Sequence, residues 1–219
     1  MNIWDKIYNY TIFNGLDKNE IKALTFCFKS KVRKYEKNEV IVNKGERFDN
    51  IVLIISGQAK VVNYMQNGNV NMNSKLNVGD IFGAIELFSN SGQYLSNVIA
   101  SKKTEAILFN KYIVNSVCEN NCFRHKKFLQ NLTSLVAQEY IKKQQIIDIL
   151  SARSTKEKVL LLLKSFAKEQ NVKYIEIPLS RQEMADFLAV DRSALSLTLS
   201  KMKKDGIIDF EKNHFVIKS

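Results

Sequence analysis

Histidine and cysteine are scarce in this sequence of 219 residues, which contains two histidines and three cysteines. A metal-dependent enzyme built on a small β-barrel needs several histidines and carboxylates gathered around its ion. With only His125 and His214, the chain offers no such set. It also has no glycine-rich phosphate loop and no nucleophile elbow. We therefore predict that the protein is not an enzyme.

The sequence also lacks a long apolar run and a disulfide framework. No stretch approaches the roughly 20 apolar residues that span a bilayer. Residues 1–10 lack the basic start and apolar core of a signal peptide. The spacing of the three cysteines is not that of a disulfide framework, which indicates reduced thiols. We expect a cytoplasmic protein without a membrane partner.

Acidic residues are too few to balance the basic ones. The chain has 33 lysines and arginines against 22 aspartates and glutamates, a formal charge of +11 and a pI near 9.5. Such a charge favours a polyanionic partner, with nucleic acid the first candidate and an acidic membrane surface the second. The excess is spread along the chain, so charge alone does not locate the binding region.

Glycine is concentrated in one part of the chain. Residues 1–28 carry helically spaced apolar residues and little glycine, whereas six of the eight glycines lie between positions 45 and 92. The short β-rich runs between them predict an antiparallel sandwich or roll, with a type I′ hairpin at Asn67-Gly68. The expected strands are 39–43, 51–56, 59–65, 70–76, 96–100 and 105–109.

From about Lys111 to Leu150 the sequence contains neither glycine nor proline, which predicts one long helix. A helix of this length needs tertiary support. Its apolar residues recur in approximate heptad steps interrupted by Glu139, so a second copy of the chain could bury them. Packing on its own domain is the alternative. The stripe consists of Phe128, Leu132, Leu135, Lys142, Ile146 and Ile149.

The last third of the chain predicts a winged helix-turn-helix. Ser-x-x-Glu capping boxes at 154–157 and 180–183 each predict the start of a helix. Asp191 is placed to cap a further helix, and Gly206 to end it. Short apolar runs on both sides of 211–213 predict a β-hairpin wing. Helix, strand, helix, helix and hairpin in this order are typical of the DNA-binding motif.

The last helix of this motif has an apolar side and a side of small or basic groups, which suit a major groove and its phosphates. A helical hairpin within a core, with a basic end that complements the helix dipole, is the alternative. Arg192 would contact guanine or phosphate and Leu197 a thymine methyl, which predicts an A·T-rich half-site. The predicted DNA-binding residues are Ser180, Arg181, Arg192, Ser193, Ser196, Leu197, Ser200, Lys201 and Lys204.

Taken together, these features resemble the Crp/Fnr family of bacterial regulators over nearly the whole chain. The resemblance is carried by Lys44-Gly45-Glu46, IVLIISG at 51–57, Gly79-Asp80-x-Phe82-Gly83, LSRQE at 179–183 and Arg192-Ser193-x-Leu195-Ser196. It implies an α+β fold with a β-roll sensor domain (1–117), a dimerisation helix (118–150) and a winged helix-turn-helix (151–219). It also implies a homodimer on a palindromic promoter site, a small effector, and contact with RNA polymerase if the protein is an activator.

The chain departs from the family at the effector site. Members that bind cyclic AMP resemble one another in a glutamate and an arginine, whose positions fall here at Ala84 and Leu95. A desolvated phosphodiester needs a cation or several donors, and Leu95 supplies neither. We therefore predict an effector other than cyclic AMP, such as an apolar molecule, haem or a peptide-like thiol, or none. The candidate pocket residues are Phe82, Gly83, Ala84, Ile85, Glu86, Leu87, Tyr94, Leu95 and Ser96.

Cysteine placement bears on a second version of the sensor, in which haem or a metal detects redox state or a gas. Cys27 is alone near the N-terminus, which disfavours the family's four-cysteine iron–sulfur cluster. Cys118, Cys122 and His125 would share one face of the predicted helix and are candidate ligands. The alternative is that both cysteines are small apolar residues near the dimer seam and that His125 is solvated. A ligand-binding protein without DNA function would leave the winged segment unexplained.

Overall fold

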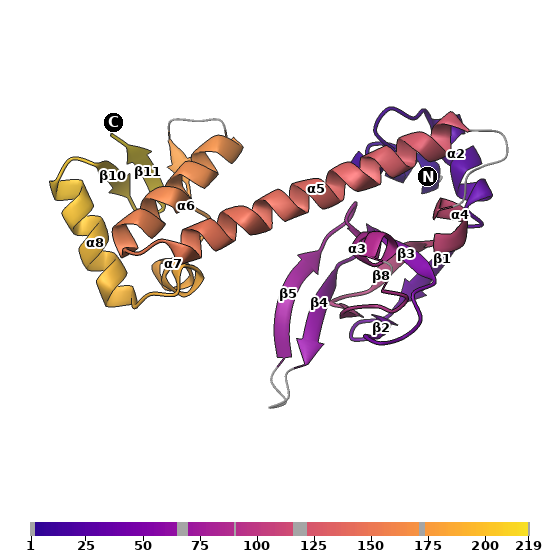
Figure 1. The fold of residues 1–219 in the computed structure, drawn as a ribbon, viewed down its shortest axis with the longest axis horizontal. Helices are drawn as coiled ribbons and strands as arrows, with labels where there is room; N and C mark the ends of the chain where they lie inside the picture. Colours follow the sequence, from indigo (N-terminus) through magenta and orange to yellow (C-terminus); the bar gives the residue numbers. More distant parts are fainter. Residues whose placement is uncertain (1–2, 65–69, 90, 116–121, 171–173, 219) are drawn as a thin grey trace. The chain divides into compact units, whose positions relative to one another are not determined.

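The computed structural model describes residues 3–64, 70–89, 91–115, 122–170 and 174–218 (Figure 1). The chain divides into two compact units, residues 1–137 and 138–219. The sequence suggested three segments instead (1–117, 118–150 and 151–219). The difference arises because the longest helix is shared, with its first half packed in one unit and its last turns in the other.

Short helices open the first unit, as the apolar spacing of residues 1–28 predicts. They are α1 (Ile3–Ile7), the 3-10 turn η1 (Thr11–Phe13) and α2 (Lys18–Cys27). A capping box begins α2, since the Asp17 carboxylate accepts from the Glu20 amide at 2.8 Å and the Glu20 carboxylate accepts from the Asp17 amide at 2.9 Å.

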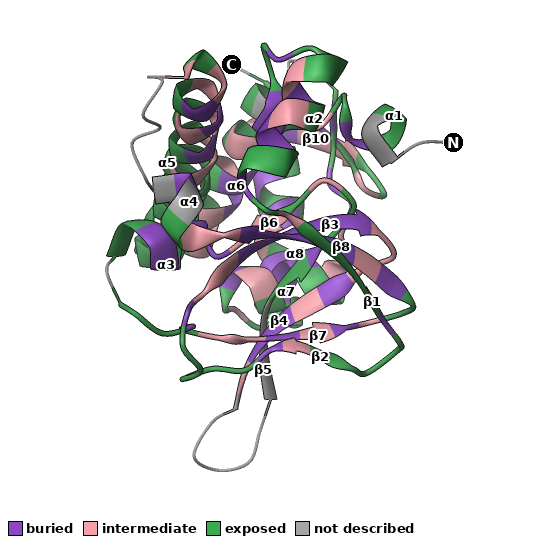
Figure 2. Cartoon of the chain, turned by 90° about the vertical axis from the view of Figure 1, so that its right-hand side faces the viewer, coloured by how far each residue is buried: buried purple, intermediate pink, exposed green. Residues whose placement is uncertain are grey.

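Two four-stranded antiparallel sheets form the β-roll of this unit (Figures 1 and 2). β3 is buried at each residue from Ile51 to Ile55, so both of its faces are covered. The predicted antiparallel roll is confirmed. One sheet has the order β1 (Lys31–Tyr35), β8 (Thr104–Asn110), β3 (Asn50–Ser56) and β6 (Ile81–Phe82), and the other β2 (Val40–Val42), β7 (Asn97–Ala100), β4 (Ala59–Tyr64) and β5 (Val70–Leu76).

The predicted hairpin joins β4 and β5, which pair from Ala59 opposite Leu76 to Tyr64 opposite Val70. Its Asn67-Gly68 turn lies outside the described residues. β1 and β6 were not predicted, because β1 is a largely exposed, basic edge strand and β6 has only two residues.

The prediction of one helix from Lys111 to Leu150 is wrong at its start. α3 (Ala84–Ser89) precedes β7 in the roll, α4 spans Lys111–Asn115, and the long helix α5 runs from Phe123 to Ser151. Cys122 lies just before α5, and residues 116–121 lie outside the described part of the chain.

Most of the stripe assigned to a second copy is buried within this chain. Phe128 and Leu132 are fully buried in the core of the first unit, where Leu135 packs against them. Ile149 is buried in the core of the second unit. The alternative of packing on its own domain therefore holds for these four residues. The large apolar residues of the second half of α5 that stay exposed are Tyr140, Ile141, Ile146, Ile147 and Leu150.

The second unit is the predicted winged helix-turn-helix. Its three strands form an antiparallel sheet of order β10-β11-β9, and helices and sheet share one core that includes Leu163, Leu195 and Phe215. No helix in the described part of the chain is long and apolar enough to cross a membrane. The elements are α6 (Thr155–Gln170), β9 (Ile175–Glu176), α7 (Arg181–Leu188), α8 (Arg192–Lys204), β10 (Ile208–Glu211) and β11 (His214–Ile217).

Candidate nucleic-acid interface and effector site

α7 begins at the predicted capping box. Ser180 Oγ accepts from the Glu183 amide at 3.2 Å, and the Glu183 carboxylate accepts from the Ser180 amide at 2.8 Å. The bond from the Ser180 amide lowers the pKa of Glu183. The helix ends at Ala189, whose left-handed backbone (φ 51°) turns the chain sharply toward α8.

α8 buries Leu195, Leu199 and Met202 against the core and turns its other residues outward. Leu197 is 77% exposed, which leaves its methyl groups open to a partner. The Ser200 hydroxyl donates to the Ser196 carbonyl at 2.9 Å, so a partner would find its oxygen only as an acceptor. The α8 residues that the sequence assigned to DNA are all exposed: Arg192, Ser193, Ser196, Leu197, Ser200, Lys201 and Lys204.

The start of α8 differs from the expectation in one bond. Asp191 is the N-cap residue, as predicted, but its side chain makes no capping hydrogen bond. Spacing placed the carboxylate correctly but could not fix its rotamer. The first amides of α8 therefore lack the side-chain acceptor that α7 has.

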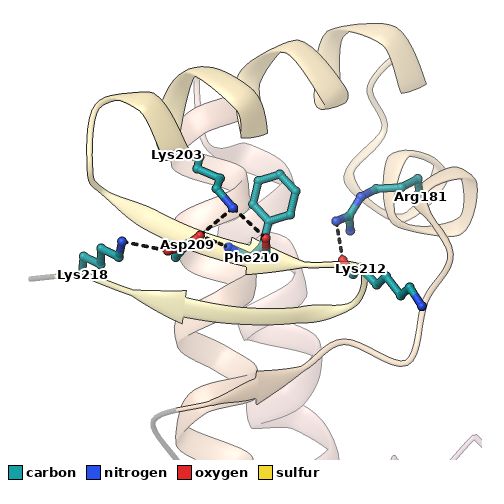
Figure 3. Close-up of polar contacts among 6 residues, drawn as sticks. All are labelled: Arg181, Lys203, Asp209, Phe210, Lys212 and Lys218. Carbon is teal, nitrogen blue, oxygen red and sulfur yellow. Dashed lines mark hydrogen bonds and ion pairs between the residues drawn. The ribbon is translucent and has the colours of Figure 1, made fainter.

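Arg181 lies against the wing rather than among the exposed residues of α8 (Figure 3). Its guanidinium carbon is 5.2 Å from the ring centre of Phe210 and 5.0 Å from that of Phe215. Its Nη2 donates to the Lys212 carbonyl at 2.5 Å. Burial lowers the pKa of Arg181.

The base of the wing carries an ion cluster that was not predicted from the sequence (Figure 3). The Asp209 carboxylate lies 2.7 Å from Lys203 Nζ and 2.8 Å from Lys218 Nζ, and Lys203 also donates to the Phe210 carbonyl at 3.0 Å. The hydrogen bonds from Lys203 and Lys218 hold the pKa of Asp209 well below its usual range. A lone aspartate in the apolar run IIDF, close to a run of lysines, is the signal that could have revealed it.

The candidate effector residues of the β-roll contribute largely to its core. Tyr94 is buried, with its ring 5.3 Å from that of Phe48 and 6.2 Å from that of Phe82. The Tyr94 hydroxyl donates to the Asn50 carbonyl at 2.8 Å, and burial raises the pKa of Tyr94 to about 12. Ala84 and Leu87 are also buried in this core.

Gly83 is required where it stands. Its φ is +99°, and a Cβ there would lie 3.1 Å from the Phe48 ring and 3.3 Å from the backbone of Asn50 and Ile51. This close approach presses the start of α3 against β3.

The other candidate effector residues face different surroundings. Glu86 is buried, and its Oε1 accepts from the Leu95 amide at 3.3 Å. The Leu95 side chain is 46% exposed and that of Ile85 is 53% exposed, while Ser96 is half-buried. The structure therefore brings these residues together around α3, but splits them between the core and the surface.

His125 is buried, so the alternative that describes it as solvated is wrong. Its ring meets that of Phe28 edge-on at 4.9 Å, and burial lowers its pKa. Within the described residues, Nδ1 of His125 has no hydrogen-bond partner. The histidine therefore packs as an aromatic residue would, against Phe28 at the end of α2.

Cys122 and His125, the two candidate metal ligands within the described residues, do not both lie in one helix as predicted. Cys122 precedes α5, where its carbonyl accepts from the His125 amide at 3.1 Å, and Cys118 lies outside the described residues. Burial acts to raise the pKa of Cys122, but hydrogen bonds from the His125 and Arg124 amides and the Arg124 side chain outweigh it and lower the pKa. Across the described ranges, no three histidine, cysteine or acidic side chains gather as metal ligands.

Comparison with known proteins identifies both units. A model of the cyclic nucleotide-binding domain matches residues 32–121, and a model of the Crp-like helix-turn-helix domain matches residues 158–219. The chain belongs to the Crp/Fnr family of transcription regulators. Members of this family bind DNA and are not enzymes, so this protein is a DNA-binding transcription regulator.

Individual members of the Crp/Fnr family are distant in sequence. The transcriptional activator protein FnrL of Cereibacter sphaeroides is 22% identical over an alignment of 205 residues, which covers 84% of this chain and 75% of that protein. The catabolite activator protein of Thermus thermophilus is 18% identical, with a TM-score of 0.55, over 94% of this chain and 93% of that chain. The regulator CLP of Xanthomonas campestris is 15% identical, with a TM-score of 0.56, over 93% of this chain and 100% of that chain. These two structures show a shared fold.

Proposed function

We propose that this regulator acts as a homodimer that reads a two-fold symmetric DNA site with α8. The exposed face of α8 carries the proposal. Its buried side is complete with Leu195, Leu199 and Met202, so the outward side chains are free for base edges. A recognition helix contacts bases chiefly through its N-terminal half, where Arg192 and Ser196 lie.

The chemistry of these side chains favours a particular half-site. Arg192 can bond guanine O6 and N7 with both arms of its guanidinium. Leu197 suits a thymine methyl, and Ser200, whose donor is already used, suits the amino group of adenine or cytosine. Lys201 and Lys204 supply charge for phosphates. We therefore expect A·T-rich half-sites that contain one guanine contacted by Arg192.

The exposed apolar residues of α5 support a homodimer. Tyr140 and Ile147 are seven residues apart and Leu150 follows after three more, which places them on one face of the helix. They are 67%, 54% and 39% exposed in the single chain. A second copy of the same helix would cover them, as in a coiled coil.

The effector in this proposal is not cyclic AMP. Leu95 brings no charge to the site, and Phe82 and Tyr94 pack on each other instead of forming a polar cradle. CLP is described as responsive to c-di-GMP, another anionic nucleotide, and the same lack of a cation at Leu95 applies. Haem, a peptide-like thiol, another apolar molecule, or no effector fits these residues better. Cytoplasmic location, and RNA polymerase contact if the protein activates transcription, complete the proposal.

Selection from a random-sequence pool of duplexes tests the proposal. The purified full chain is expected to enrich an inverted repeat whose half-site centres are about 34–36 Å apart, one helical turn of DNA. Each half-site should contain the guanine that Arg192 reads. Enrichment of a single half-site would contradict the dimeric arrangement, and failure to enrich any sequence would contradict sequence-specific reading by α8.

A further inference from the structure

We infer that Arg181 is a positioning residue that holds the wing, and that the phosphate contact in this part of the domain belongs to Lys212 at the wing tip. This inference rests on the proposed DNA-binding function and assigns the wing a role within it. Sequence position alone suggested the opposite, since Arg181 begins α7 beside the groove-facing helix and looks like a free cation.

The guanidinium of Arg181 is already engaged on several sides. It lies over the rings of Phe210 and Phe215, which are themselves 5.5 Å apart at an angle of 32°. Nη2 donates to the Lys212 carbonyl, and Nη1 is 3.9 Å from the Met184 sulfur. A phosphate that drew Arg181 out of this position would cost it two aromatic faces and one short hydrogen bond.

These contacts fix the turn of the wing. Lys212 has a left-handed backbone (φ 50°), which is strained for a residue with a side chain. The bond from Arg181 to its carbonyl holds this conformation, and the Ile177 amide donates to the neighbouring Asn213 carbonyl at 2.9 Å. The tip is therefore tied to the start of α7 on one side and to the strand before it on the other.

The Lys212 side chain is left free by the same arrangement. The Lys212 carbonyl accepts the hydrogen bond from Arg181, but the residue is exposed and its side chain points away from the hairpin (Figure 3). At the other end of the hairpin, Lys203 of α8 contacts the Asp209 carboxylate and the Phe210 carbonyl, which holds β10 against α8. Both ends of the wing thus move with the helix-turn-helix, and Lys212 is presented to the DNA backbone at a set distance from α8.

Salt dependence of DNA affinity separates positioning from direct contact, because the logarithm of affinity changes with the logarithm of salt concentration by about 0.9 per phosphate contact. The probe is the duplex that the wild-type chain enriches from a random pool. The variants are Arg181→Ala, Lys212→Ala and both together, with Lys22→Ala of the exposed surface of α2 as the matched loss of one charge.

If Arg181 positions the wing, Arg181→Ala and Lys212→Ala each reduce the salt slope of DNA affinity by the equivalent of about one phosphate contact. The double variant also reduces it by about one contact in total, because both changes remove the same contact. Arg181→Lys then behaves like Arg181→Ala, because an ammonium cannot reproduce the stacked, forked geometry of the guanidinium. If Arg181 touches a phosphate itself, the double variant loses about two contacts and Arg181→Lys behaves like the wild type. That result would overturn the inference.

Folding and the proposed function are checked in the same experiment. A melting temperature within a few degrees of the wild type shows that each variant is folded, and Arg181→Lys, which keeps the aliphatic stem and charge, serves if Arg181→Ala does not fold. Failure of the dimeric function would appear already in the wild type, as an enriched site without two half-sites. Failure of this inference appears only in the variants, when the decrease in salt slope for the double variant equals the sum of the decreases for Arg181→Ala and Lys212→Ala.

Discussion

In the proposed function, single side chains of α8 determine which bases the regulator reads. Arg192 is exposed at the first turn of the helix, whereas Lys204 lies at its last residue. Replacing Arg192 by Ala should cost about 1–3 kcal/mol of binding free energy on the enriched duplex and relax selection at one base pair. Lys204→Ala is the matched control and should weaken all sequences alike. The check is affinity for the enriched duplex and its single-base variants. Equal losses on enriched and scrambled duplexes for Arg192→Ala would show that Arg192 contacts only phosphate.

The Asp209 cluster makes the wing sensitive to acid. Because the folded-state pKa of Asp209 is depressed, its ion pairs stabilise the wing above the ordinary pKa of 3.8, and this contribution is lost as pH falls further. Asp209→Asn should therefore speed hydrogen exchange of the β10 and β11 amides at pH 6. The difference from the wild type should shrink below about pH 4, in line with that linkage. Glu211→Gln, on the same strand, is the control. A difference that stays constant with pH would contradict the assignment.

For helices and strands, the sequence predicted where helices begin, but it did not predict which surface each helix packs against. The capping boxes at Ser154 and Ser180 depend on residues three apart, so they predicted the starts of α6 and α7. The stripe of α5 has the right period for burial, but a period does not say which surface buries it. The Phe128 ring packs against those of Phe13, Phe28 and Phe109, which lie far from it in sequence.

The candidate site shows the same division between local pattern and long-range contact. The outward face of α8 follows from helical spacing and was predicted residue by residue. The position of Arg181 depends on Phe210 and Phe215, about thirty residues later in the chain, so its contacts could not be read from its neighbours. For the same reason the burial of His125 against Phe28 was missed.

The exposed face of α5 should join two chains. Ile147→Glu places a charge in the middle of that face and should convert a dimer into a monomer of 25.2 kDa, because an unpaired carboxylate would have to be buried. Gln138→Glu lies on the opposite side of α5 and is the matched control. Sedimentation equilibrium gives the molar mass of each variant in solution. A wild-type chain that is already monomeric, or an Ile147→Glu dimer, would contradict the assignment of this face.

For the whole molecule, the proposal is that DNA binding is controlled by an effector other than cyclic AMP, or by none. A ligand at 100 times its dissociation constant stabilises the folded state by about 2.7 kcal/mol. Cyclic AMP and cyclic GMP should therefore leave the melting temperature of the full chain unchanged, whereas a shift with haem or glutathione would name the class of signal. A clear rise with cyclic AMP would show that the β-roll recognises the phosphodiester despite Leu95.

Sequence-specific reading of DNA by the dimer is tested by comparing two affinities. The full chain is titrated with the enriched duplex and with a scrambled duplex of the same length and composition, at one fixed salt concentration. The enriched duplex is expected to bind at least about 1000-fold more tightly, as is typical of specific readout by a recognition helix. Equal affinity for both duplexes would mean that the basic surface attracts DNA without sequence-specific contacts, and would rule out specific recognition by α8.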